Sequence, residues 1–158
     1  MQAQGTAMTR THLVLSESTL LRIRDSFARQ GLMAHLGAEI GDIGPGTVTI
    51  RLPFRAELTQ QHGYFHGGAT AAIADAAGGY AGSTLMPDGS SVLTVEFKLN
   101  LLNPAQGARL EAVGRVVKSG RTLTISRIDV WAAEAERRVH VATGVQTLIC
   151  VPDRPAAP

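Results

Sequence analysis

The chain has 158 residues, of which 44% are hydrophobic, so it is long enough and apolar enough to bury one core. Its 15 Lys and Arg nearly balance its 13 Asp and Glu, and neither sign forms blocks, which argues against a nucleic-acid partner. The single cysteine, Cys150, excludes an internal disulfide, and no apolar run has the length of a signal peptide or a membrane span. We therefore expect a soluble, cytoplasmic protein with no membrane partner.

The first helix is expected close to the N-terminus. Residues 1–12 are predicted to be disordered. From there to Arg29, apolar side chains recur at helical spacing, and Ser16 or Ser18 can cap the first turn. Gly31 is expected to stop this amphipathic outer helix.

Two short strands and a loop are predicted next. The stretches His35–Ile43 and Thr47–Leu52 have strand character, and in the second the apolar side chains alternate with polar ones. The sequence Gly-Pro-Gly at 44–46 joins them as a hairpin. A loop from Pro53 to Phe65 then leads to the segment around which the chain is organised.

That organising segment is 63–82, which reads GYFHGGATAAIADAAGGYAG. Gly67 and Gly68 stand where a helix begins, and the helix formers from Ala69 to Tyr80 include almost no polar side chain. Such a helix is expected to be buried and to end between 82 and 85. Asp75 is then a carboxylate on a buried helix, which is costly unless a partner or a function compensates for it.

Four longer strands are predicted after this helix. Apolar and polar residues alternate along the first of them, with the apolar set at Leu93, Val95, Phe97, Leu99 and Leu101. The other three are expected at 109–117, 122–132 and 138–151, separated by turn sequences. The remainder, 152–158, is predicted to be an unfolded tail, which makes 13–151 one domain.

The predicted order is one helix, two strands, one buried helix and four strands, which indicates an α+β fold. An antiparallel sheet curled around the buried helix would cover it on most sides. The HGG sequence at 66–68, followed by Asp75 and the small residues after it, resembles the PaaI-like acyl-CoA thioesterases of the 4-hydroxybenzoyl-CoA thioesterase superfamily. This resemblance spans about 30–150 and implies a hotdog fold, with a sheet wrapped around one long central helix.

The chemistry of thioester hydrolysis points to the same residues. Hydrolysis of a thioester needs a nucleophile beside the carbonyl carbon and hydrogen-bond donors aimed at the developing oxyanion. A helix N-terminus offers free N–H groups and a partial positive charge. We therefore predict that the Gly67 N–H, assisted by Gly68, is the oxyanion donor and that Asp75 is the general base or the nucleophile.

One chain cannot complete this site. Gly67 and Asp75 lie eight residues apart on one helix, which separates them by ~12 Å at the rise of an α-helix. If two copies pack their central helices antiparallel about a two-fold axis, Asp75 of one copy faces the partner's Gly67. The small residues Ala72, Ala76 and Gly79 would allow the helices to approach closely. The resemblance implies the same homodimer, with acyl-CoA across its seam and with dimers pairing into a homotetramer.

Three more site residues follow from the resemblance. Gln60 stands six residues before His66, where the family usually has asparagine, and Gln61 or His62 could substitute for it. Thr94 resembles the strand hydroxyl that orients the water or the acid. By strand alternation it faces the side opposite Leu93 and Val95, so it can help only if that strand lies at the dimer seam. His66 resembles the motif histidine that shapes the helix entrance.

Two other functions stay open from the sequence. A hotdog hydratase or dehydratase would use a histidine and an acid together, and an acyl-CoA-binding module would need no catalysis at all. Asp75 could also be purely structural, and Gly67 and Gly68 could form an ordinary turn. No cofactor is implied. No metal site is expected either, because His62 and His66 have no second cluster of ligands nearby.

Overall fold

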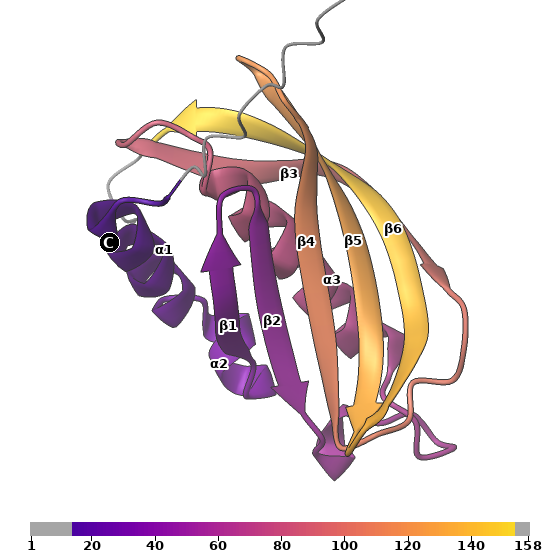
Figure 1. Ribbon diagram of the computed structural model, residues 1–158. Helices are drawn as coiled ribbons and strands as arrows, with labels where there is room; N and C mark the ends of the chain where they lie inside the picture. Colours follow the sequence, from indigo (N-terminus) through magenta and orange to yellow (C-terminus); the bar gives the residue numbers. More distant parts are fainter. Residues whose placement is uncertain (1–13, 154–158) are drawn as a thin grey trace, which may run out of the picture.

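The structure is a computed structural model and describes residues 14–153. One six-stranded antiparallel sheet, in the order β1-β2-β4-β5-β6-β3, curls around the long helix α3 (Gly67–Ser83). Figure 1 shows α3 lying along the concave face of the sheet, with α1 and α2 to one side. The predicted hotdog architecture is therefore confirmed. The segments predicted to be disordered, 1–12 and most of 152–158, lie outside the described residues.

The N-terminal part contains two helices where the sequence predicted one. Helix α1 (Glu17–Ala28) is capped by Ser16, whose hydroxyl accepts a hydrogen bond from the Thr19 N–H at 3.2 Å. Gly31 does not end the helical region, because it begins a second short helix, α2 (Gly31–Leu36). The prediction of a strand from His35 was therefore wrong at its start. Met33 and Leu36 are buried against the core, so α2 is a second amphipathic helix.

The first hairpin forms as expected, but its first strand begins at Glu39 and not at His35. Strand β1 (Glu39–Gly44) pairs antiparallel with β2 (Thr47–Pro53), and the turn between them contains Gly46 at φ +69°. In β2 the fully buried side chains alternate with partly exposed ones, which matches the predicted one-faced strand. A short 3-10 turn, η1 (Ala56–Leu58), interrupts the loop that leads to α3.

Helix α3 is buried because the strands approach its backbone directly. Twelve of its 17 residues are buried, and most of them are alanine or glycine. A Cβ added to Gly114 on β4 would lie 2.2 Å from the carbonyl oxygen of Ala77, so only glycine allows this contact. Small residues on both elements thus let the sheet close around the helix.

The four long strands also match the prediction. They are β3 (Ser90–Leu101), β4 (Arg109–Ser119), β5 (Leu123–Glu134) and β6 (Arg137–Pro152). Two residues of the predicted tail are ordered: Pro152 ends β6, and the Asp153 N–H donates to the Gly89 carbonyl at 3.0 Å. Strand β6 therefore ends one residue beyond the predicted end at 151.

Strand β3 is the exception to the expectation of one covered face. It forms an edge of the sheet, pairing only with β6 among the described strands. Four large apolar side chains along it are 41% to 63% exposed: Leu93, Val95, Phe97 and Leu101. A long apolar edge strand is a template for pairing with another chain.

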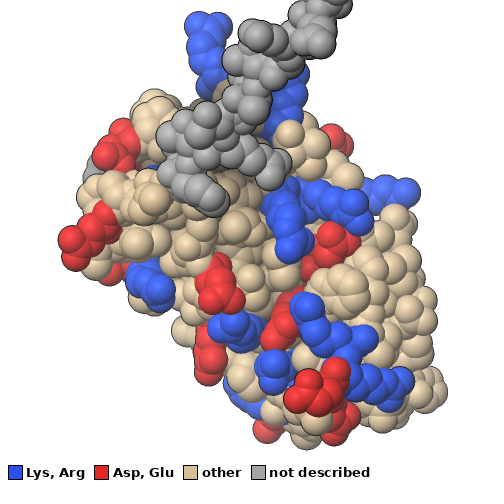
Figure 2. Space-filling view, in the orientation of Figure 1, with Lys and Arg blue, Asp and Glu red and all other residues tan. Residues whose placement is uncertain are grey.

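Charged side chains gather on the outside of the sheet. Figure 2 shows acidic and basic residues intermingled on this side of the molecule. Asp129 on β5 is 8% exposed and sits beside the Arg127 guanidinium, with Nε 3.1 Å from Oδ2. The Thr143 hydroxyl donates to Oδ1 at 2.8 Å, and His140 Nε2 lies 3.0 Å from the same oxygen. Both oxygens of this carboxylate are therefore occupied.

Candidate active site

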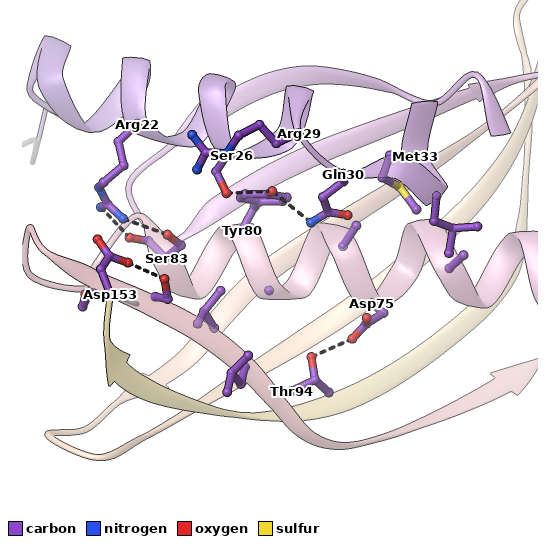
Figure 3. Close-up of a pocket in the computed structure, with 18 residues that line it drawn as sticks. Arg22, Ser26, Arg29, Gln30, Met33, Asp75, Tyr80, Ser83, Thr94 and Asp153 are labelled. Carbon is purple, nitrogen blue, oxygen red and sulfur yellow. Dashed lines mark hydrogen bonds between the residues drawn. The ribbon is translucent and has the colours of Figure 1, made fainter. Parts of the chain in front are cut away.

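Asp75 faces a cavity of about 430 Å³ beside α3. The cavity lies between three walls, formed by α1 and α2, by the small residues of α3, and by the start of β3. In Figure 3, Asp75 and Thr94 point toward one another at one end of this space, and Arg22 and Ser83 lie at the other. The acid predicted from the sequence thus lines an open cavity and is not sealed in the core.

The carboxylate of Asp75 is anchored through only one of its oxygens. Oδ1 accepts a hydrogen bond from the Thr94 hydroxyl at 2.7 Å and another from Gln146 Nε2 at 2.6 Å. No donor from residues 14–153 reaches Oδ2. The side chain is therefore held in place while one oxygen stays free for chemistry.

Strand β3 contains a bulge immediately after Thr94. The register with β6 shifts between Thr94 and Glu96, so that Val95 is an extra residue in the strand. Thr94 faces α3, opposite Leu93 as predicted, but beyond the bulge Leu99 packs on the core and Leu101 reaches α3. The prediction that the apolar residues of 93–101 all lie on one face was therefore wrong, because Leu99 and Leu101 lie on the same face as Thr94. The hydroxyl meets Asp75 of its own chain and does not depend on the seam.

Gln146 is the member of this site that sequence reasoning missed. It lies on β6, is fully buried, and its Nε2 contacts Asp75 Oδ1, the Asp75 carbonyl oxygen at 3.2 Å and Thr94 Oγ1 at 2.9 Å. The signal was a polar residue among the inward-facing positions of β6, between Gly144 and Leu148. Such a residue needs partners in the core.

The other half of the predicted site lies at the N-terminus of α3. Gly67 lines a second cavity, also of about 430 Å³, together with Gln60, Tyr64 and Leu101. Within the described part of the chain, no acceptor bonds the Gly67 N–H. This amide is therefore a free donor at the positive end of the helix dipole.

His66 and Gly68 are engaged with each other. His66 is the N-cap of α3, and its Nδ1 accepts a hydrogen bond from the Gly68 N–H at 2.8 Å. The histidine thus shapes the helix entrance, as the resemblance implied, and the Gly68 N–H is already satisfied. Gln60 is turned inward along its own loop, where its side-chain oxygen accepts from the His62 N–H.

The two cavities are separate within one chain. They have no lining residue in common: Asp75 and Thr94 belong to the first, Gly67 and Gln60 to the second. The expected distance of ~12 Å along an α-helix explains this separation. Asp75 therefore cannot share a ligand atom with the Gly67 amide of its own chain.

The described residues form neither a metal site nor a membrane-spanning helix. Across 14–153 no three His, Cys, Asp or Glu side chains group in a way that could hold a metal ion. None of the helices in that range is long and apolar enough to cross a membrane.

Comparison with known proteins identifies the family. The sequence model of the thioesterase superfamily matches residues 62–138. A thioesterase family protein of known structure from Silicibacter pomeroyi is 44% identical and superposes with a TM-score of 0.83, covering 85% of this chain and 99% of that one. The chain belongs to the thioesterase superfamily.

Two further proteins of known name resemble the chain. Proofreading thioesterase EntH of Klebsiella pneumoniae is 27% identical over 132 residues, which cover 84% of this chain and 96% of that protein. The PaaI protein of E. coli, whose structure covers 87% of this chain with a TM-score of 0.75, is 19% identical and shows likeness of fold. The predicted hotdog fold and the enzyme class, a thioester hydrolase, are thus confirmed.

Proposed function

We propose that this thioesterase hydrolyses acyl-CoA thioesters at a site shared by two copies of the chain. Asp75 of one copy would act on the carbonyl carbon, and the partner's Gly67 N–H would stabilise the oxyanion. The observation that carries this proposal is that each half is incomplete. Asp75 has a free oxygen in a cavity that Gly67 does not line, and the Gly67 amide is a free donor in a cavity that Asp75 does not line.

The chemistry follows from these two groups. The amide at the helix N-terminus polarises the thioester carbonyl and binds the developing negative charge. Asp75 Oδ2 either takes a proton from the attacking water or attacks the carbonyl carbon itself. In the first route the water oxygen bonds to carbon, the C–S bond breaks, and the CoA thiolate leaves and is protonated. In the second an acyl anhydride on Asp75 forms and water then cleaves it, which gives the same products.

Strand β3 supplies the seam for such a dimer. Its unpaired edge is 12 residues long and carries Leu93, Val95, Phe97 and Leu101 as exposed apolar side chains. Pairing with the same strand of a second copy would continue the sheet and bury these side chains. The two central helices would then lie on one continuous concave face, running antiparallel. Association of such dimers into a tetramer stays a prediction.

The acyl group is proposed to lie in the cavity beside Asp75. One turn further along α3, Gly79 has no protein atom within 4 Å of the place where a Cβ would be, so packing within the chain does not require glycine there. Ala72 and Ala76 line the same wall, and Met33 of α2 lies opposite. The pantetheine arm would leave toward the partner's second cavity, where Gln60 lines the wall. Gln60 and Thr94, which line the two cavities, are proposed to bind the substrate, and His66 and Gly68 are proposed to shape the helix entrance beside it.

Release of free thiol from a panel of short, medium, long and aryl acyl-CoAs tests the activity, and two variants test the oxyanion donor. Gly67→Pro removes the N–H at the first helical position, where proline is well tolerated, and Gly67→Ala keeps it as the matched control. We expect Gly67→Pro to lose roughly 10²- to 10³-fold in kcat, the usual effect of one oxyanion donor. Equal activity of the proline and alanine variants would contradict the role of Gly67.

The hydratase alternative gains no support from the site. Such an enzyme needs a histidine that reaches the substrate carbons, and His66 lines neither of the two cavities. A cytoplasmic location stays a prediction.

A further inference from the structure

Gln146 is placed in the core in a way that stability alone does not explain. Its side chain is completely buried between β6 and α3. The amide oxygen, Oε1, is buried without a hydrogen-bond partner among the described residues. A buried acceptor left unsatisfied costs about 1–3 kcal/mol, so an apolar residue of similar size would pack here at less cost. The unsatisfied oxygen therefore needs an explanation.

The amide has only one workable orientation. Its nitrogen faces three oxygens, which are Oδ1 and the main-chain carbonyl of Asp75 and Oγ1 of Thr94. The amide oxygen in that position would face the Asp75 carboxylate and the Asp75 carbonyl, both of which only accept hydrogen bonds. The NH₂ group must therefore point toward Asp75, and Oε1 is left facing the backbone of α3.

The backbone of α3 is shaped to admit this orientation. A Cβ added to Gly78 would lie 1.9 Å from Gln146 Oε1. Glycine at 78 thus leaves room for an oxygen that gains no hydrogen bond there. This arrangement requires glycine at 78 and leaves Gln146 Oε1 without a hydrogen bond. It also fixes Gln146 Nε2 as a donor to Asp75.

We propose that Gln146 is a positioning residue for Asp75. It acts through the carboxylate and does not touch the substrate. By donating to Oδ1 together with Thr94, it holds the Asp75 side chain so that Oδ2 is the oxygen presented to the cavity. This inference rests on the proposed function of Asp75, and it adds the hydrogen bonds that hold that carboxylate in position beside an open cavity.

The first test is Gln146→Leu, which keeps most of the side-chain volume but removes the donor. We expect kcat to fall roughly 10- to 100-fold, the size of effect that a small misplacement of a catalytic group produces. KM should stay within about two-fold, because the residue does not contact the substrate. The melting temperature should change little, since the unsatisfied oxygen is also removed. An unchanged kcat, or a rise in KM alone, would overturn the inference.

Gln146→Glu provides a pH-dependent readout that packing would not produce. A protonated carboxyl at this position can still donate to Asp75 Oδ1, and an ionised one repels it. Asp75 is the titratable group that faces this position from α3, and Thr94 on β3 and Ser126 on β5 face it as neutral hydroxyls. The ratio of variant to wild-type kcat should therefore fall as the pH rises. A flat ratio would contradict the role of the donor.

Two variants separate positioning from general packing. Gly78→Ala leaves Gln146 in place but displaces its amide through Oε1, so kcat should fall as in Gln146→Leu. Ser126→Ala, the matched control, removes a neighbouring buried hydrogen bond to the Gly78 carbonyl oxygen that does not involve Asp75. It should leave kcat unchanged. Equal losses in both variants would overturn the inference, as would full activity in Gly78→Ala.

A double-mutant cycle with Asp75→Asn distinguishes this inference from the proposed function. If Gln146 acts through Asp75, adding Gln146→Leu to Asp75→Asn should cost no further activity. A further loss of the same factor would show that Gln146 acts elsewhere and would overturn this inference alone. Wild-type activity in Asp75→Asn itself would overturn both. An inactive Asp75→Asn combined with a fully active Gln146→Leu would leave the proposed function standing and remove the positioning role.

Discussion

The buried carboxylate of Asp129 and the partly buried carboxylate of Asp75 have opposite surroundings. Asp129 on β5 has both oxygens occupied, Oδ2 by the Arg127 guanidinium and Oδ1 by the Thr143 hydroxyl, and His140 Nε2 lies 3.0 Å from Oδ1. Asp75 on α3 has two neutral donors, and both reach the same oxygen. The first carboxylate is compensated as an ion within the sheet. The second is held still and left open to a cavity.

This difference separates a structural acid from a functional one more clearly than burial does. A carboxylate satisfied on both oxygens has no lone pair to offer a substrate, and its partners stabilise the charge. A carboxylate with one free oxygen beside a cavity has the group that a base or nucleophile needs. The pattern of donors around each acid therefore predicts which property a mutation will change.

The largest expected effect comes from removing the charge at each position. Asp75→Asn should lower kcat on acyl-CoA by about 10²- to 10⁴-fold, because the general base or nucleophile is lost. The melting temperature should stay close to that of the wild type. Asp129→Asn should do the reverse, with kcat retained and stability lowered by about 1–2 kcal/mol, since its partners are partly exposed. Thiol release and thermal unfolding on both variants check this pair.

A second contrast concerns where each acid finds its partners. Asp129 meets them in its own chain, whereas Asp75 is proposed to need the partner's Gly67. A charge on the apolar edge, Val95→Lys, should therefore break the dimer and lower activity on the order of 100-fold, as for loss of an oxyanion donor. Val117→Lys, on a similarly exposed valine of β4, is the matched control. Gel filtration with activity assays would decide, and a monomeric Val95→Lys of full activity would contradict the seam.

Removing the threonine hydroxyl that donates to each carboxylate should give a smaller effect of the same kind. Thr94→Val deletes one of the two donors on Asp75 and should lower kcat about 10-fold with KM little changed. Thr143→Val deletes one partner of Asp129 and should cost about 1 kcal/mol of stability with kcat unchanged. If both variants lost stability and neither lost activity, the two carboxylates would have the same role.

The smallest effect is on the pH dependence of stability. Burial raises the pKa of Asp129, but hydrogen bonds from Thr143 and Arg127 and the nearby positive charges outweigh it, so the pKa lies below its ordinary 3.8. Its stabilisation is fully present above that ordinary value and is lost as the pH falls through the folded-state pKa. Unfolding of wild type and Asp129→Asn should therefore differ at neutral pH and converge in acid. A constant difference would contradict the linkage.

The sequence predicted the elements that depend on local pattern. The buried helix and the long strands were found because alanine and glycine run together and because apolar residues alternate. Helix α2 was missed because a six-residue helix carries too little periodicity to be distinguished from a strand. The bulge at Val95 was missed because apolar and polar residues continue to alternate in the sequence on both sides of it. The pattern therefore does not show that one residue is left unpaired.

The sequence predicted only those site residues that lie close together in one segment of the chain. Asp75, Gly67 and His66 fall in one motif, and their separation along a helix follows from its rise per residue. Gln146 lies 71 residues from Asp75 and meets it only because β6 crosses the middle of α3. Contacts of this kind depend on sheet order, which the sequence pattern did not determine.

The shared site is tested most directly by mixing two inactive variants, Asp75→Asn and Gly67→Pro. A mixed dimer has one site with both groups intact, built from Asp75 of the proline variant and Gly67 of the asparagine variant. After free exchange of subunits, about one quarter of wild-type activity should return, because half the dimers are mixed and each has one working site. No recovery, with mixed dimers demonstrated by differently tagged chains, would contradict the account.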